Sequence, residues 1–275
     1  MRPTDRTGTL LENSVLRSTE MSEEATGAMP TSRPNIATRV QRRDRFYLIM
    51  SGVMLLIVLA GFSPTLYLRA LFDVPAIPPY LYLHGAVMSC WVLWLVIQAS
   101  LVASRRTDIH RRIGMAGAVL GVGIVTAGLM ATLGVVSRLP AMGIDLETEI
   151  GFVSFVVFGN LGSLVVFSAL LITAIILRHR SEVHKRLMLL ASFNVIGPAF
   201  NRISYWPVFD WIEEEPFSSA SMLIFFAVMG VHDLIVRRRF HTATTVGILF
   251  MFLTLVVSAV IANTEFAHSI LRGMR

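Results

Sequence analysis

The sequence predicts an all-α protein, an integral membrane seven-helix bundle with its N-terminus in the cytoplasm and its C-terminus outside. Three observations support this fold class. Hydrophobic residues make up 54% of the 275 residues and charged residues only 15%, against about 25% charged residues in a soluble domain. Seven apolar runs approach the length of about 20 residues that a membrane helix needs. Arginine and lysine are concentrated in alternate connections between these runs.

The first 45 residues are expected to form a disordered cytoplasmic tail. They are rich in Ser, Thr, Pro, Glu and Arg and show little apolar periodicity, which is the composition of a segment that cannot bury a core. They also lack the apolar stretch of a secretory signal peptide. Met21 and Met29 lie within this segment, and either is a candidate start residue.

The transmembrane domain is expected over residues 46–262, with a short outer tail at 263–275. Its apolar runs lie at 46–68, 80–103, 113–136, 151–177, 187–206, 217–236 and 242–262. Pro198, in the fifth run, cannot donate a hydrogen bond to the carbonyl of Asn194, so a kink is expected there. The third run predicts close packing against a neighbouring helix, because it carries Gly114, Gly117, Gly121, Gly123, Gly128 and Gly134. The only cysteine, Cys90, excludes an internal disulfide.

The basic residues predict the orientation. One set of connections, with the segment before the first run, carries Arg39, Arg42, Arg43, Arg45, Arg105, Arg106, Arg111, Arg112, Arg178, Arg180, Lys185, Arg186, Arg237, Arg238 and Arg239. The alternate connections carry only Arg69 and Arg138. Because cytoplasmic loops are enriched in Lys and Arg, the first set is expected in the cytoplasm of a bacterium and the bundle in its inner membrane. The same distribution argues against a nucleic-acid partner, since the charge is not gathered on one face.

Polar side chains inside the runs fall into two layers. The outer layer contains His84, Asn201 and Arg202. The inner layer contains Gln98, His110, His184, His232, Asp233 and His241. Ionisable groups at membrane depth are costly and usually have a function. The competing interpretation is that the histidines cap helices or lie among lipid headgroups, and that Arg202 extends to the outer headgroups.

The inner layer predicts a cofactor site. Imidazoles from facing helices can hold a b-type haem, so His110, His184, His241 and His232 are candidate ligands of one haem in a redox-associated membrane protein. Retinal is excluded because Lys185 is the only lysine and lies outside the seventh run. His179 and His184 have the spacing of one di-iron box, but a second box is missing. Two haems are not expected, because the second would need another histidine ligand on the same helix, and the residue 14 positions after His84 is Gln98.

The alternative function is a small-molecule carrier, or a membrane protein that binds a quinone, a lipid or a small anion in the bilayer without redox chemistry. Its candidate ligand-binding residues are His84, Asn201, Arg202 and Gln98. A guanidinium group holds a carboxylate, phosphate or quinone oxygen well, and a few polar groups at one end of an apolar site are typical of ligand binding. A purely structural or regulatory membrane protein is the third class.

Four segments, HGAVMSCWVLWLVIQ, HRRIG, HKRLMLL with a downstream arginine, and HDLIVRRRFH, resemble those of a family of bacterial polytopic inner-membrane proteins. The resemblance covers residues 80–245, and HKRLMLL is its most specific part. It implies the fold, gives no reaction, and marks as candidate residues His84, Gln98, His110, Arg111, Gly114, His184, Arg202, Asp233 and His241. In that family the residue before the aspartate is commonly not histidine, which weakens His232 as a ligand.

Overall fold

The computed structural model describes residues 36–72, 74, 76–203, 206, 208 and 214–274. The chain divides into two units, residues 1–40 and 41–275. From the first unit only the start of helix α2 (Ile36–Phe62) is described. Residues 36–45 are therefore helical, although the sequence predicted a disordered tail there, and the rest of that expected tail lies outside the described residues.

All regular secondary structure in the described part of the second unit is helical, with no strand there, which confirms the all-α class. After α2 its elements are η1 (Ser63–Tyr67), η2 (Arg69–Leu71), α3 (Pro79–Ala103), α4 (Thr107–Leu133), η3 (Val136–Arg138), η4 (Pro140–Met142), α5 (Ile150–Ile176), α6 (Ser181–Val195), α7 (Gly197–Asn201), α8 (Glu214–Arg237), α9 (Thr242–Ala262) and α10 (Glu265–Gly273). Within the described residues, six helices are long and apolar enough to cross a membrane: α2 with η1 from Arg45, α3, α4, α5, α8 from Ser219, and α9. The chain is thus a multi-pass membrane protein.

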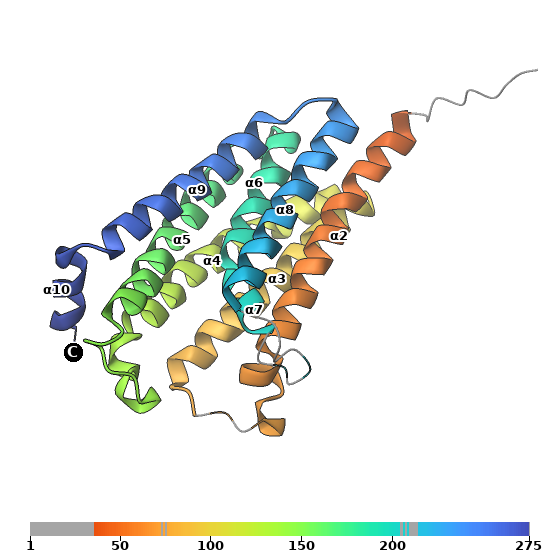
Figure 1. Ribbon diagram of the computed structural model, residues 1–275. Helices are drawn as coiled ribbons and strands as arrows, with labels where there is room; N and C mark the ends of the chain where they lie inside the picture. Colours follow the sequence, from red (N-terminus) through yellow and green to blue (C-terminus); the bar gives the residue numbers. More distant parts are fainter. Residues whose placement is uncertain are drawn as a thin grey trace, which may run out of the picture. The chain divides into compact units, whose positions relative to one another are not determined.

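The fifth apolar run differs from the expected continuous helix. It forms two helices, α6 and α7, which are separated at Ile196. Pro198 lies in the first turn of α7, where a missing N–H is tolerated, but it could not continue α6 without losing the hydrogen bond to Asn194. The kink expected at Pro198 is therefore present as a complete break. Figure 1 shows α7 continuing from the end of α6 beside α8.

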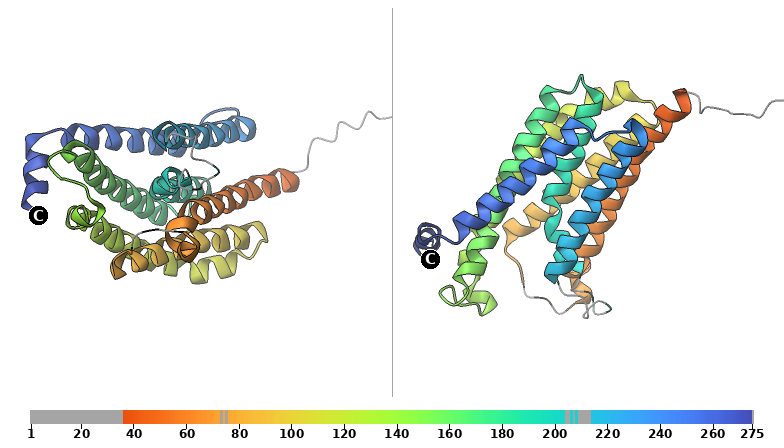
Figure 2. Two further views of the ribbon diagram at one scale, coloured as in Figure 1. Left: turned by 60° about the horizontal axis from the view of Figure 1, so that its bottom comes forward. Right: turned by 45° about the horizontal axis from the view of Figure 1, so that its top comes forward.

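Helix α6 is the central helix of the second unit. It packs against α5 and α9, while α7 packs against α8, and Figure 2 shows the other long helices around it. Most of its side chains are buried: Arg186, Leu187, Leu189, Leu190, Ala191, Ser192, Phe193 and Val195. The only strongly polar residue in that set is Arg186, so its buried charge requires a partner inside the protein.

The glycines of α4 allow close approach by neighbouring helices, as the sequence predicted. A side chain at Gly117 would lie 2.8 Å from the indole nitrogen of Trp94 in α3, and one at Gly128 would lie 2.8 Å from Leu164 in α5. Gly114 is the exception on this helix, since nothing lies within 4 Å of the place that a side chain would take. Open space therefore exists one helical turn beyond His110.

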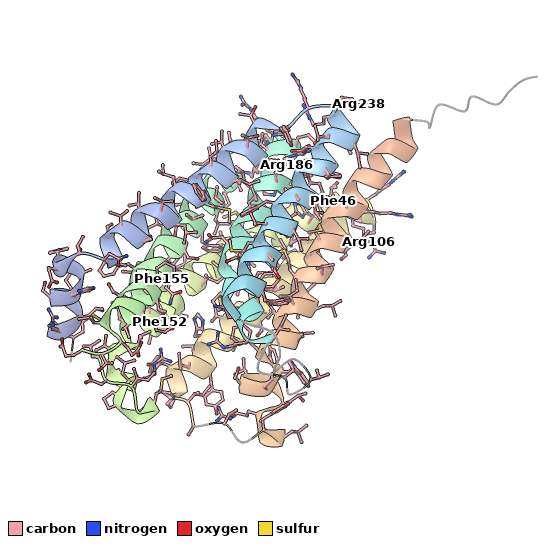
Figure 3. The ribbon with its side chains drawn as sticks, viewed as in Figure 1. Phe46, Arg106, Phe152, Phe155, Arg186 and Arg238 are labelled. Atoms are coloured by element: carbon pink, nitrogen blue, oxygen red, sulfur yellow. The ribbon has the colours of Figure 1, made fainter. Side chains whose placement is uncertain are left out.

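The connections α3–α4 (104–106), α5–α6 (177–180) and α8–α9 (238–241) define what we call the basic end of the bundle. Figure 3 shows Arg106 and Arg238 at this end, and Phe152 and Phe155 toward the opposite one. Arg105 and Arg238 adopt the left-handed conformation, with φ of 62° and 60°. Glycine is the usual residue at such a helix end, so the arginines occupy these turns at a conformational cost.

The opposite end, which we call the far end, is closed by the α4–α5 connection and α10. Residues 263–275 were expected to be only a short tail, but they include this capped helix: the hydroxyl of Thr264 accepts a hydrogen bond from the Ala267 amide. Leu271 is fully buried against the α4–α5 connection and the start of α5. Arg272 of α10 forms an ion pair with Glu147 at 3.2 Å. These contacts hold the C-terminal helix against the bundle.

Candidate functional site

Two of the candidate histidines lie together at the basic end. His110 is in the first turn of α4 and His184 in the first turn of α6. Their ring centroids are 6.3 Å apart, with the ring planes at 80° to one another. Sequence separation gives no reason for this contact, since α5 lies between the two helices in the chain. We refer to these residues as the histidine pair.

Each member of the histidine pair is held through one ring nitrogen. Nδ1 of His184 is 2.8 Å from the carbonyl oxygen of Ala174 in α5. The ring of His110 makes a hydrogen bond with the carbonyl of Gln98 in α3, while its Nδ1 is buried without a hydrogen-bond partner among the described residues. A carbonyl partner requires N–H at the nitrogen that faces it. The other nitrogen of each neutral ring then carries a lone pair, which is the form in which histidine binds a metal.

The side chain of Gln98 adds further polar atoms at this level. Its Oε1 and Nε2 are both buried and have no hydrogen-bond partner in the described part of the chain. Trp91 lies on the same face of α3, and its Nε1 donates to Ser192 of α6 at 3.1 Å. Two turns of α3 carry Gln98 about 10 Å further toward the basic end. Gln98 of α3 and His184 of α6 therefore lie at the same depth in the bundle, so the Gln98 amide and the histidine pair share one layer.

The other two inner histidines lie in different surroundings. His232 stacks on Phe46 with 3.7 Å between ring centroids. His241 precedes α9 and caps it, since its Nδ1 accepts a hydrogen bond of 3.0 Å from the Ala243 amide. Burial lowers the pKa of His241 below its ordinary value, and the nearby charges of Arg186 and Arg237 lower this pKa further. The four candidate haem ligands thus divide into one pair, one stacked ring and one helix cap.

A buried ion pair lies beside this layer. The guanidinium group of Arg186 in α6 donates from Nε at 3.0 Å, and also from Nη2, to Oδ1 of Asp233 in α8. Oδ2 of Asp233 accepts from Thr244 Oγ1 at 2.6 Å and from the His241 amide at 3.1 Å. Both charged side chains are 1% exposed or less. This network joins α6, α8 and α9.

Glu182 completes the network at the start of α6. Its Oε2 accepts a hydrogen bond of 2.8 Å from Nη1 of Arg186. The sequence marks Asp233 as a candidate residue, but it indicates only an orientation role for Arg186 and no role for Glu182 or Thr244. The signals were present, because Glu182 and Arg186 have the spacing of a helical ion pair and a carboxylate inside an apolar run needs a cation.

The outer-layer residues lie toward the far end. His84 is half-buried in α3, and its ring makes a hydrogen bond with the Ala127 carbonyl of α4. Its Nδ1 is buried, with no hydrogen-bond partner in the described residues. Asn201 is the last residue of α7. Arg202 follows it, donates to the Pro198 carbonyl at 3.1 Å and lies 4.9 Å above the ring of Phe62.

The chemistry open to the histidine pair depends on how many ligands the protein supplies. No group of three or more His, Cys, Asp or Glu side chains able to hold a metal ion occurs among the described residues. Of the remaining residues that the resemblance marked, Arg111 is exposed at the start of α4, and Gly114 faces the open space described above. The layer therefore offers two imidazoles and one amide.

Comparison with known proteins identifies no relative, since no protein-family model, curated protein or solved structure matches this chain.

Proposed function

We propose that this chain is a bacterial inner-membrane protein that crosses the bilayer seven times and binds one b-type haem between His110 and His184. The six apolar helices support the membrane location. Helices α6 and α7 supply the seventh crossing, because Ser181 to Asn201 spans about 31 Å at 1.5 Å per residue, the thickness of the hydrocarbon core. The segment is less apolar than its neighbours because it is surrounded by protein.

The orientation of the proposed protein follows from the basic end. The connections at that end carry exposed arginines, among them Arg105, Arg106, Arg178 and Arg238. Such an excess is typical of the cytoplasmic side. We therefore place the basic end, with the histidine pair, in the cytoplasmic half of the membrane.

Reporter fusions test this orientation. A reporter joined after residue 210 is expected to be active in the periplasm, because α6 and α7 together would cross the membrane once after the cytoplasmic α5–α6 connection. A reporter joined after residue 239 is expected to be active in the cytoplasm, because α8 would cross back. The measurement is the activity of paired periplasmic and cytoplasmic reporters at each position. The reverse pattern would contradict the orientation, and cytoplasmic activity at both positions would contradict the seventh crossing.

The spacing of the histidine pair is the observation that carries the haem proposal. Two imidazoles that would hold one metal, with bonds of about 2 Å from metal to nitrogen and about 1 Å from each nitrogen to its ring centre, would have ring centroids roughly 6 Å apart. The observed separation is 6.3 Å. The orphaned Nδ1 of His110 and the open space beside Gly114 also fit a bound group.

The number of ligands favours haem over a bare ion. Structural zinc takes four protein ligands and catalytic zinc three, whereas a haem brings four nitrogens of its own and needs only axial ligands. Two imidazoles on facing helices match the second requirement.

The protein contributes orientation and a defined protonation state. The Ala174 carbonyl holds the ring of His184 through Nδ1, the Gln98 backbone interacts with the ring of His110, and Nδ1 of His110 has no hydrogen-bond partner among the described residues. The Gln98 amide supplies a donor and an acceptor for a polar edge of the bound group. A b-type haem in this position supplies one-electron transfer.

Difference spectra test the haem proposal. Protein purified from haem-replete cells is expected to show b-type bands in a reduced-minus-oxidised spectrum, and His110→Ala or His184→Ala should abolish them because each would remove one of the two residues proposed to hold the haem. His110→Met should keep the haem and raise its reduction potential, as methionine ligation does.

His179→Ala is the matched control for these variants. His179 is an exposed histidine five residues before His184 at the same end of the bundle, so its loss should leave the spectrum unchanged. A wild-type protein that yields no haem on extraction would overturn the proposal, as would equal haem content in wild type and both alanine variants.

A further inference from the structure

A second polar site lies about 20 Å from the histidine pair along α3, around His84. The Ala127 carbonyl interacts with the ring of His84, and Nδ1 of that ring is buried with no hydrogen-bond partner among the described residues. A buried polar atom without a hydrogen-bond partner destabilises the fold. Its presence in a helix interface therefore points to a partner that binds there.

Positive charge is arranged around His84 from two other elements. Arg138 in η3 donates from Nε to the Gly134 carbonyl at 2.9 Å and from Nη2 to the Ala131 carbonyl at 3.3 Å, at the end of α4. Arg202 stands over Phe62 at the end of α2. Both guanidinium groups lie close enough to His84 to interact with it electrostatically.

Close packing contacts fix α3, which carries His84, against η1 and the end of α2. A side chain at Gly85, next to His84, would lie 2.6 Å from Leu66 of η1, and the Tyr67 hydroxyl makes a 2.6 Å hydrogen bond with Ser89 of α3. Element η1 directly follows α2, whose last residue, Phe62, lies beneath Arg202. The arginine and the histidine are thus fixed to adjacent, tightly packed segments.

We propose that His84 and Arg202 bind the carboxyl group of an amphipathic acid that enters from the outer leaflet. A carboxyl group matches this pair because one proton can be shared between a carboxyl oxygen and Nδ1 of His84, while the other oxygen accepts from the guanidinium group of Arg202. His84 lies less than two turns inside α3, at the depth of a membrane interface, and exposed apolar side chains such as Leu83 adjoin it for an acyl chain. This site is independent of the haem proposal.

Binding of oleate tests the site. Labelled oleate is expected to bind the purified protein in detergent, and methyl oleate, which lacks the carboxyl group, should compete at least about tenfold less well, as expected for one charge-assisted hydrogen bond. Unlabelled acetate serves as the other competitor. Competition by acetate at the concentrations at which oleate competes would assign the site to free carboxylates, whereas competition by oleate alone would assign it to membrane acids.

Variants separate this site from nonspecific uptake. His84→Ala and Arg202→Lys should each weaken oleate binding about tenfold or more, since lysine cannot reproduce a bidentate contact. His268→Ala is the control, because His268 in α10 also has a buried ring nitrogen without a hydrogen-bond partner among the described residues. Equal affinity for oleate and methyl oleate in the wild type, or equal losses in the His84 and His268 variants, would overturn the proposal. Haem content should be unchanged in all three.

Discussion

Asp233→Ala is expected to lower the free energy of unfolding by about 3–5 kcal/mol, the usual effect of removing one partner of a buried ion pair. The substitution leaves the guanidinium group of Arg186 buried without its carboxylate, and it removes the acceptor for the Thr244 hydroxyl and the His241 amide. Thermal and denaturant unfolding of the purified protein in detergent, together with its folded yield, measure the change.

Two further variants test whether the unpaired charge of Arg186 causes this loss of stability. The double variant Arg186→Met, Asp233→Leu should recover much of the stability, because a buried ion pair can be replaced by apolar residues of similar volume at little cost. Glu265→Ala removes a carboxylate that is 88% exposed and should have little effect. If the free energy of unfolding of Asp233→Ala were within about 1 kcal/mol of the wild-type value, the network that joins α6, α8 and α9 would not depend on this ion pair.

Gly61→Ala is expected to have the second-largest effect. Gly61 is buried in α2, and an added methyl group would overlap the backbone carbonyl of Ala199 in α7. Backbone cannot move aside as a flexible side chain can, so α2 and α7 must separate, at a cost of about 1–3 kcal/mol. The measurement is the same unfolding assay.

Gly52→Ala provides the matched control on the same helix. Nothing lies within 4 Å of the position that its methyl group would take, and alanine is a better helix former than glycine by about 1 kcal/mol. Gly52→Ala should therefore be neutral or stabilising. If the two variants unfolded alike, the close contact between α2 and α7 would be refuted.

The sequence predicted the membrane helices well because hydropathy depends on composition alone. The runs at 80–103, 151–177 and 242–262 match their helices to within one residue at each end. The third helix starts six residues before its apolar run, since five of the six residues from Thr107 to Arg112, in its first turns, are polar. Polar residues at a helix start are invisible to hydropathy, which is also why the start of α6 was assigned to a connection.

The contacts within the site were harder to predict, because depth in the membrane alone does not decide which side chains touch. The positions of His110, His184, His232 and His241 relative to the apolar runs indicated a common layer. Which of them face one another depends on helix rotation and on the order of helices around α6, and neither is encoded in hydropathy. Arg186 was missed for a related reason, since it was counted among the basic residues that set orientation.

The central position of α6 also has a consequence for biogenesis. An arginine in a membrane-spanning segment opposes insertion of that segment. Within α6 Arg186 pairs with Glu182, but its buried carboxylate partner, Asp233, comes from α8, and the hydroxyl that supports Asp233 comes from α9. Both helices are synthesised after α6. If α6 and α7 form the proposed seventh crossing, stable integration of α6 waits for Asp233 and Thr244, which lie in the last sixth of the chain, and ribosomes stalled before residue 233 are expected to leave this segment outside the lipid or retained at the insertion machinery.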